Sequence, residues 1–175
     1  MTNNNKYCDV AVHGTKAYFS PCWEDHIGVF DTAMNAFMKI PVSGWSVTDK
    51  RYFGAAVVGA RIYFAPWTED HVGVLDTTTN VFSKITLGAY PPTTNSEKFL
   101  GAVAVGTRVV FAPRHLNSVE VLDTVTGTFT SVPLPTNVMG DYKYYGAVAV
   151  GSRVFFSPQA PAGIGVLNLA PWLSL

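Results

Sequence analysis

Hydrophobic residues occur in short runs separated by turn residues, and these runs recur in the same order four times. The first run of each copy begins with a cation and an aromatic residue, and successive copies are offset by 45, 47 and 45 residues: Lys6–Val12, Arg51–Val57, Lys98–Ala104 and Lys143–Ala149. Val, Ile, Phe and Tyr dominate the runs and favour strands, and no stretch shows the 3.6-residue period of an amphipathic helix. The pattern predicts an all-β repeat protein.

Turn residues divide each copy into strands. A glycine follows the first run where a tight hairpin needs a positive φ: Gly14, Gly59, Gly106 and Gly151. After the third run, Asn35, Asn80 and Gly127 stand where a left-handed residue would close a second hairpin. Four antiparallel strands in about 45 residues is the size of one blade of a β-propeller.

Repeated charges predict the strand register. A cation opens the second strand and an acid or amide closes the third, at the positions Lys16, Arg61, Arg108 and Arg153, and Asp31, Asp76, Asp123 and Asn168. A hairpin between these strands would place 16 opposite 31 and 61 opposite 76. We interpret these residues as structural ion pairs or turn caps.

The segment Val72–Asn80, followed by Ile85–Gly88, resembles the blade of the YVTN-type propellers, and the whole unit is similar to kelch repeats. This resemblance implies a β-propeller fold. Propellers of this kind serve as scaffolds, as ligand binders and, more rarely, as enzymes.

We expect a single propeller domain over 1–175, with blades at about 6–50, 51–97, 98–142 and 143–175. The fourth copy departs from the pattern after Asn168, so its outer strand is expected to be short, altered or missing. Small residues on the innermost strands, such as Gly54 and Gly101, favour a closed four-bladed ring. The alternative is a half-ring that a second chain completes.

Composition narrows the function. Lys and Arg together number 12, as do Asp and Glu, so no excess positive charge favours nucleic acid. No apolar run approaches the length of a membrane span, and the first residues lack a secretory signal pattern, so a cytoplasmic location is favoured. The two cysteines, Cys8 and Cys22, have no counterparts in the other copies and are expected to be free thiols.

The loops between the second and third strands should emerge on one face, together with linkers that carry Trp45, Tyr90 and Tyr142. These loops hold the candidate ligand-binding residues: Trp23, Glu24, Asp25, His26, Trp67, Glu69, Asp70, His71, Arg114 and His115. Tryptophan can stack on a sugar ring, and carboxylate and His can accept hydrogen bonds or hold a metal ion. The simpler interpretation is a set of hydrogen-bonded loops, and we predict neither a metal nor a cofactor.

The cations that begin the first strands, Lys6, Arg51, Lys98 and Lys143, are expected to be solvated strand ends or, alternatively, a ring that holds an anion. No catalytic motif is present. The sequence therefore favours a non-enzymatic module that binds a small polar ligand, for example a glycan, or a protein segment. The alternatives are an assembly protein that oligomerises through the incomplete fourth blade, and an enzyme whose site lies on the loop face.

Overall fold

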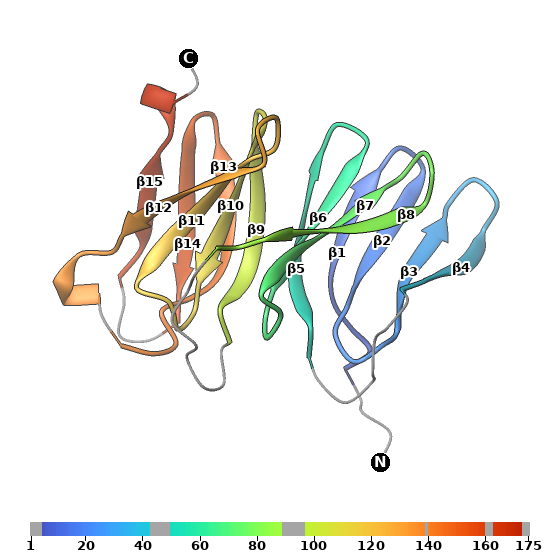
Figure 1. Ribbon diagram of the computed structural model, residues 1–175, viewed down its shortest axis with the longest axis horizontal. Coiled ribbons are helices and arrows are strands. Elements are labelled where there is room, and N and C mark those ends of the chain that lie inside the picture. Colours follow the sequence, from blue (N-terminus) through green and yellow to red (C-terminus); the bar gives the residue numbers. More distant parts are fainter. Residues whose placement is uncertain (1–4, 43–49, 89–96, 139, 160–162, 173–175) are drawn as a thin grey trace.

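The computed structural model describes residues 5–42, 50–88, 97–138, 140–159 and 163–172. They form four antiparallel sheets and two short 3₁₀ turns, η1 (Thr136–Val138) and η2 (Ala170–Trp172). The predicted all-β class is confirmed (Figure 1). None of the described helices is long and apolar enough to cross a membrane.

Each sheet is one copy of the repeat, with its strands in chain order. Blade 1 consists of β1 (Tyr7–His13), β2 (Lys16–Pro21), β3 (His26–Asp31) and β4 (Ala36–Pro41). Blade 2 consists of β5 (Tyr52–Val58), β6 (Arg61–Pro66), β7 (His71–Asp76) and β8 (Val81–Thr86). Blade 3 consists of β9 (Phe99–Val105), β10 (Arg108–Pro113), β11 (Ser118–Asp123) and β12 (Thr128–Pro133). Blade 4 consists of β13 (Tyr144–Val150), β14 (Arg153–Pro158) and β15 (Gly165–Asn168).

The hairpin turns have the predicted backbone. Gly14 and its three equivalents have φ between 57° and 60°, and Asn35, Asn80 and Gly127 have φ of 51°, 57° and 72°. These left-handed residues end the strands at the same point in each repeat. Blade 4 has three strands within the described residues, and η2 follows β15 where an outer strand would begin, as the Pro in this segment predicts.

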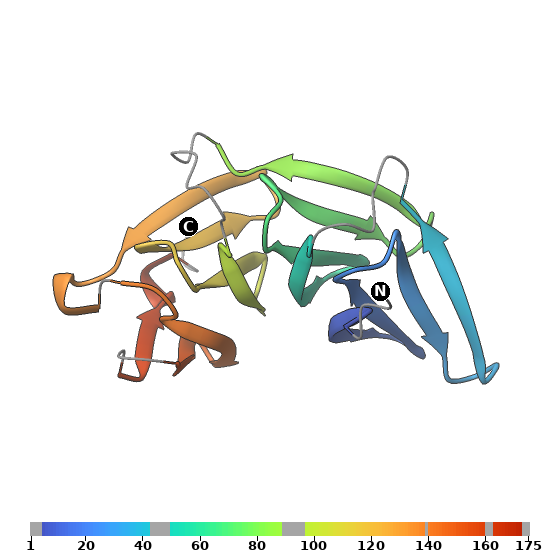
Figure 2. The same ribbon diagram turned by 90° about the horizontal axis from the view of Figure 1, so that it is seen from below.

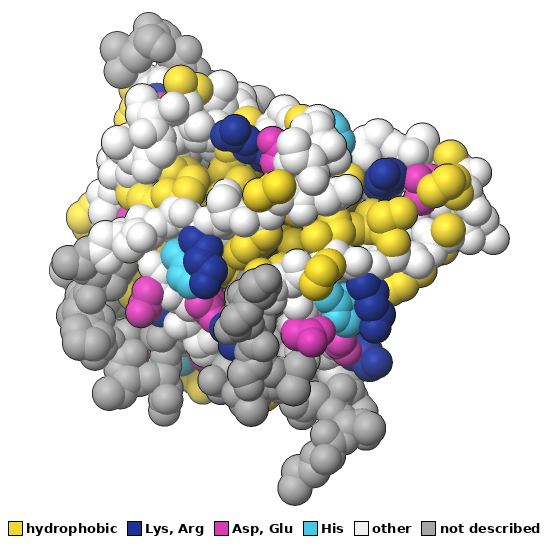
Figure 3. All heavy atoms as spheres, turned by 45° about the vertical axis from the view of Figure 1, so that its right-hand side comes forward, with side chains coloured by type: hydrophobic (Ala, Val, Ile, Leu, Met, Phe, Trp, Pro, Cys, Tyr) yellow, Lys and Arg dark blue, Asp and Glu magenta, His cyan; other side chains and the backbone are white. Residues whose placement is uncertain are grey.

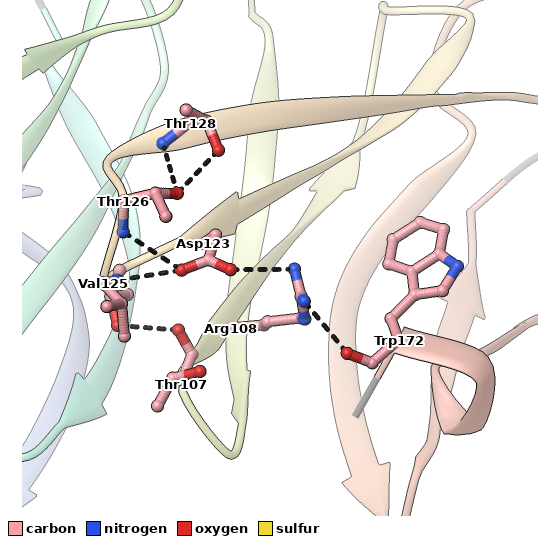
Figure 4. Close-up of polar contacts among 8 residues, drawn as sticks. Thr107, Arg108, Asp123, Val125, Thr126, Thr128 and Trp172 are labelled. Carbon is pink, nitrogen blue, oxygen red and sulfur yellow. Dashed lines mark hydrogen bonds and ion pairs between the residues drawn. The ribbon is translucent and has the colours of Figure 1, made fainter. Parts of the chain in front are cut away.

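The predicted charge register is confirmed. Arg61 pairs with Asp76 and Arg108 with Asp123 across the second and third strands, and Lys16 and Asp31 do the same. Figure 4 shows the pair in blade 3, where Asp123 Oδ2 lies 3.2 Å from Arg108 while its Oδ1 accepts a 2.9 Å hydrogen bond from the Val125 amide. Each carboxylate therefore caps its own turn with one oxygen and faces the cation with the other.

We expect Asp76→Ala to lower the urea midpoint and Asp76→Asn to stay close to the wild type. Asp76 Oδ1 accepts from the amides of Thr78 and Thr79 at 2.9 and 3.1 Å, whereas its Oδ2 is 3.9 Å from the Arg61 guanidinium. The turn bonds therefore matter more than the ion pair, and an amide oxygen can accept them, as Asn168 does from Ala170 in blade 4. Equal losses for both variants would assign the effect to the ion pair.

The same variants carry a pH signature. Hydrogen bonds from Thr78, then from the backbone, lower the pKa of Asp76 from 3.8 to about 2. A depressed folded-state pKa contributes stability that is present above the unfolded value and is lost as the pH falls through the folded value. The difference between wild type and Asp76→Ala should therefore narrow between about pH 4 and pH 2. A difference that does not change over this range would contradict the capping role.

Three hydrophobic cores lie between successive blades. The first core joins one side of blade 1 to blade 2, and each later interface repeats it. We call the side of a blade that faces the next blade its forward face; in blade 1 it carries Ala11, Tyr18, Ile27 and Val29. The opposite side is the backward face, and in blade 2 it carries Tyr52, Ile62, Phe64 and Leu75. The innermost strands β1, β5, β9 and β13 pack against one another in this order.

The four blades form an open arc in Figure 2, with the described parts of blade 1 and blade 4 at its two ends. This arrangement does not confirm the closed ring of four blades that the small inner residues favoured. The small inner residues do bring the strands close, because a Cβ on Gly54 would lie 2.6 Å from the Ala102 nitrogen. That close approach sets the spacing between neighbours and does not bring the ends together.

The expectation of free thiols is wrong. Cys8 and Cys22 form a disulfide with a Cα–Cα distance of 5.6 Å. Cys8 lies in β1 and Cys22 directly follows β2, and the pairing of Tyr7 with Pro21 makes the two cysteines neighbours across the hairpin. The bond joins the first two strands of a single blade, and the other copies have no equivalent cysteines.

Candidate functional site

The loops that carry the candidate residues lie at one end of the blades, and the paired Arg and Asp residues lie at the other. In Figure 1 the β2–β3, β6–β7 and β10–β11 connections are at the lower end and the tight hairpins at the upper end. Figure 3 shows His, cationic and acidic side chains gathered at the lower end, below a hydrophobic band. Trp45 and Tyr90 lie outside the described residues.

In blade 1, the loop residues bond to one another. The Asp25 carboxylate accepts a 2.8 Å hydrogen bond from His26 Nδ1, and the Tyr7 hydroxyl makes a 2.6 Å hydrogen bond with Nε2 of the same ring. Burial, assisted by Glu24 and Asp25, raises the pKa of Tyr7 to about 12 and keeps this hydroxyl protonated. His26 is buried and acts as a support for the loop.

The same loop contains a group with metal-ligand chemistry. One donor atom each from Glu24, Asp25 and His26 lies within 4.8 Å of the others. The Lys6 ammonium is 3.5 Å from Glu24, and His26 Nδ1 is 3.4 Å from the same carboxylate. Lys6 and His26 thus already satisfy these carboxylates, and we interpret the group as a hydrogen-bonded loop.

In blade 2, the acidic residues bind cations from the strand starts. Glu69 pairs with Arg51 and lies 3.2 Å from His71, and burial lowers the pKa of His71 so that the ring is neutral at pH 7. Asp70 lies 3.0 Å from the ammonium of Lys98, which belongs to blade 3. This loop therefore links neighbouring blades.

The strand-start cations are less solvated than expected. Lys98 and Lys143 are buried, and Lys143 donates hydrogen bonds to the carbonyl oxygens of Gly140 and, at 3.2 Å, His115. Burial lowers the pKa of Lys143. In these two blades the expectation of solvated strand ends is wrong, because the cation donates to loop carbonyl oxygens of the preceding blade.

In blade 3, Arg114 is the centre of a mixed polar and aromatic cluster. Its guanidinium lies 2.8 Å from Glu97 and 4.6 and 4.8 Å from the ring centres of Tyr142 and Trp67. His115 meets Tyr142 edge to face at 5.0 Å. The cluster joins blade 2, blade 3 and the segment before blade 4.

Trp67 packs between these groups. One face stacks on Phe53 with ring centres 5.2 Å apart, and only 4% of the residue is exposed. The Lys50 ammonium is 5.3 Å from the Trp67 ring centre and 6.0 Å from that of Trp23. Trp67 therefore forms a wall of the site. A ligand would find accessible aromatic rings on other side chains.

A cavity of about 360 Å³ opens beside this wall, at the loop end of the inner strands, and we call it the axial cavity. Its lining is mainly polar, and all four blades contribute to it: Asn5, Tyr7, Cys8, Lys50, Phe53, Trp67, Glu97, Arg114 and Tyr145. Tyr145 is 55% exposed and meets Phe53 edge to face at 6.2 Å. The cavity combines cations, one carboxylate and accessible rings.

Two of the predicted site residues, Trp67 and Arg114, line the axial cavity. The others, Trp23, Glu24, Asp25, His26, Glu69, Asp70, His71 and His115, do not line it. Lys50, Phe53, Glu97 and Tyr145 also line it; they lie before or within the first strands and were not predicted from the sequence.

A signal for the missed residues exists in the repeat. Apart from Tyr7, the lining residues come from three equivalent positions of the repeat: Asn5, Lys50 and Glu97; Cys8, Phe53 and Tyr145; and Trp67 and Arg114. At each of these positions the copies differ in chemistry, although the flanking strand residues are nearly the same. Repeat positions whose residue type varies between copies, within an otherwise regular repeat, therefore indicate side chains that face the axis rather than the next blade.

Comparison with known proteins gives the fold. No protein-family model matches the sequence, and no curated protein matches it. Among solved structures, virginiamycin B lyase from Staphylococcus aureus superposes with a TM-score of 0.74 at 15% identity, over 97% of this chain and 54% of that chain. The chain has a β-propeller fold.

Other propellers give the same result. Kuenenia stuttgartiensis hydrazine synthase matches with a TM-score of 0.72 at 15% identity, over 97% of this chain and 48% of the other. A nidogen/laminin complex matches with a TM-score of 0.65 at 11% identity, over 90% and 57%. This chain spans about half the length of these solved chains. At such identities the likeness shows the fold alone.

Proposed function

We propose that the protein is a non-enzymatic binding module, with blades of the YVTN type, that holds a small polar ligand in the axial cavity. The observation that carries the proposal is the lining of this cavity, where Lys50, Glu97 and Arg114 meet the rings of Phe53 and Tyr145. Concave sites with a few convergent polar groups beside aromatic surface are typical of small-molecule binding.

The charges point to a ligand with an acidic group. Arg114 is paired with Glu97, whereas Lys50 has aromatic contacts and, among the described residues, no carboxylate within ion-pair distance. An ammonium group in a partly enclosed site binds an anion by a charge-assisted hydrogen bond. The exposed ring of Tyr145 can stack on the apolar face of a sugar. A sugar acid, such as a uronic acid, matches both features.

The test is a glycan array of neutral and acidic sugars, followed by calorimetry on the sugars that bind. Lys50→Ala and Tyr145→Ala should each weaken binding about tenfold or more, because each removes one charged or stacking contact. Lys84→Ala is the matched control, since Lys84 is an exposed lysine on β8, away from the cavity lining, and should bind like wild type. Absence of binding by wild type, or wild-type affinity in both cavity variants, would contradict the proposal.

A further inference from the structure

The two end blades expose surfaces that are buried at every interface inside the chain. Val148, Ile164 and Val166 on blade 4 occupy the repeat positions of Ala11, Ile27 and Val29 on the forward face of blade 1. They are 58%, 73% and 56% exposed, whereas Ala11, Ile27 and Val29 are buried against blade 2. The forward face of the three strands of blade 4 is therefore an apolar face that none of the described blades covers.

The backward face of blade 1 is its counterpart. Val12 is 66% exposed, and Tyr7 and Phe19 are only partly buried. The equivalents of Tyr7 and Phe19 in blade 3 are Phe99 and Phe111, which are fully buried in the core between blades 2 and 3. Each end of the arc thus carries one half of the interface that is repeated three times within the chain.

We propose that a second copy of this chain completes the ring, with blade 4 of each copy packed on blade 1 of the other to form an eight-bladed propeller. The contact is heterologous, since forward face meets backward face, and it closes with two copies related by a two-fold axis along the centre of the ring. Eight blades lie within the known range for propellers. The inference concerns assembly and does not depend on the ligand proposed above.

A hollow on blade 4 lies where such a partner would pack. It measures about 520 Å³, and its lining includes Gly146, Val148, Phe155 and Ile164. At the equivalent place between blades 2 and 3, the rings of Phe99 and Phe111 pack against Ala56, Val72 and their neighbours. The rings of Tyr7 and Phe19 from the second copy would occupy the hollow on blade 4 in the same way.

Gly146 supports the same conclusion. Its equivalents Gly54 and Gly101 are required by close packing, because a Cβ on Gly101 would lie 2.9 Å from the Cα of Gly146 in the next blade. A Cβ on Gly146 itself would meet only Ser157 Oγ, at 3.7 Å. Nothing described in this chain requires a glycine there, whereas a further inner strand packed on β13 as β9 packs on β5 would leave little room for a Cβ.

A repeated backbone hydrogen bond gives the register of the contact. The amides of Arg51, Lys98 and Lys143 donate to the carbonyl oxygens of Cys22, Trp67 and Arg114 in the preceding blade, at 3.1, 2.9 and 3.1 Å. By the same repeat, the amide of Lys6 in one copy would donate to the carbonyl oxygen of Gln159 in the second copy. The arc would thereby continue across the new interface with unchanged geometry.

Light scattering on the full chain tests the assembly. Wild type should have twice the mass of the 18.9 kDa chain. Val166→Lys and Val12→Lys should each give a monomer, because a charge would be buried at both interfaces. Val125→Lys is the control, since Val125 is 76% exposed in the β11–β12 turn, and it should remain a dimer.

Gly146→Ala is a second variant that spares the fold. Its new methyl group has room in the single chain, so thermal unfolding of the monomer should be unchanged, while assembly should be weakened at least tenfold. A monomeric wild type would overturn the proposal and assign the two faces to further blades or another protein. A dimer lost in Val166→Lys but kept in Val12→Lys would also overturn it, because it would show two blade 4 faces in contact.

Discussion

Gly54→Ala should destabilise the protein by about 3 kcal/mol, at the upper end of the usual cost of overpacking. The ideal Cβ at Gly54 lies 2.6 Å from the Ala102 nitrogen and 2.7 Å from the Gly101 carbonyl carbon. Both are backbone atoms of the next blade, held by β9 hydrogen bonds to β10, so they cannot move aside separately. Relief requires that blade 2 and blade 3 separate along their whole inner edge.

Gly28→Ala is the matched control. A Cβ at Gly28 lies 2.8 Å from Cζ of Tyr7 and 2.9 Å from Cζ of Phe37, which is nearly as close. These atoms are the far ends of partly exposed rings, which can rotate away. Urea unfolding should therefore show a clearly smaller loss for Gly28→Ala. Equal losses in the two variants would contradict the conclusion that backbone contact, rather than crowding in general, sets the blade spacing.

Loss of the Cys8–Cys22 disulfide should lower the free energy of unfolding by about 3 kcal/mol, the value expected for cross-linking a loop of this length. The cysteines are 14 residues apart and join β1 to the end of β2 in the first blade. Blade 1 is packed on one side only, so it has fewer tertiary contacts than blades 2 and 3 to replace the cross-link.

Unfolding of wild type with and without reductant measures this effect. Reductant should lower the wild-type midpoint to that of Cys8→Ser/Cys22→Ser and should leave the double variant unchanged. Two titratable thiols in the folded wild type, or a midpoint insensitive to reductant, would contradict the bond.

The register of the blades could be predicted from the sequence because local chemistry specifies it. The turn residues require a positive φ at four glycines and at Asn35 and Asn80, and the hairpins then place Arg61 opposite Asp76. The same register places Cys8 beside Cys22, although the other copies have no equivalent cysteines. One blade can carry a cross-link that its repeats lack.

The predicted site residues lie at the loop end of the blades, and of these Trp67 and Arg114 line the axial cavity. His26, Glu69 and Asp70 were selected because ionisable residues in loops resemble a binding site, yet they bond to Tyr7, Arg51 and Lys98. Their role depends on partners that are 18 to 28 residues away in the chain, which loop composition does not reveal. Lys50 and Tyr145 were missed for the same reason, because the face of a first strand that points to the axis is known only when the blades are stacked.

The sequence alone determined the all-β class, the four repeats and the strand pairing within each blade. These features follow from turn preferences and from alternation along the strand, which act over a few residues. Tertiary structure alone decided which loop residues line a cavity, which lysines are buried and how far round the axis four blades extend. The angle between two blades results from many contacts, such as that of Gly54 with Gly101. The extent of the arc is the sum of these angles, and no local sequence pattern encodes that sum.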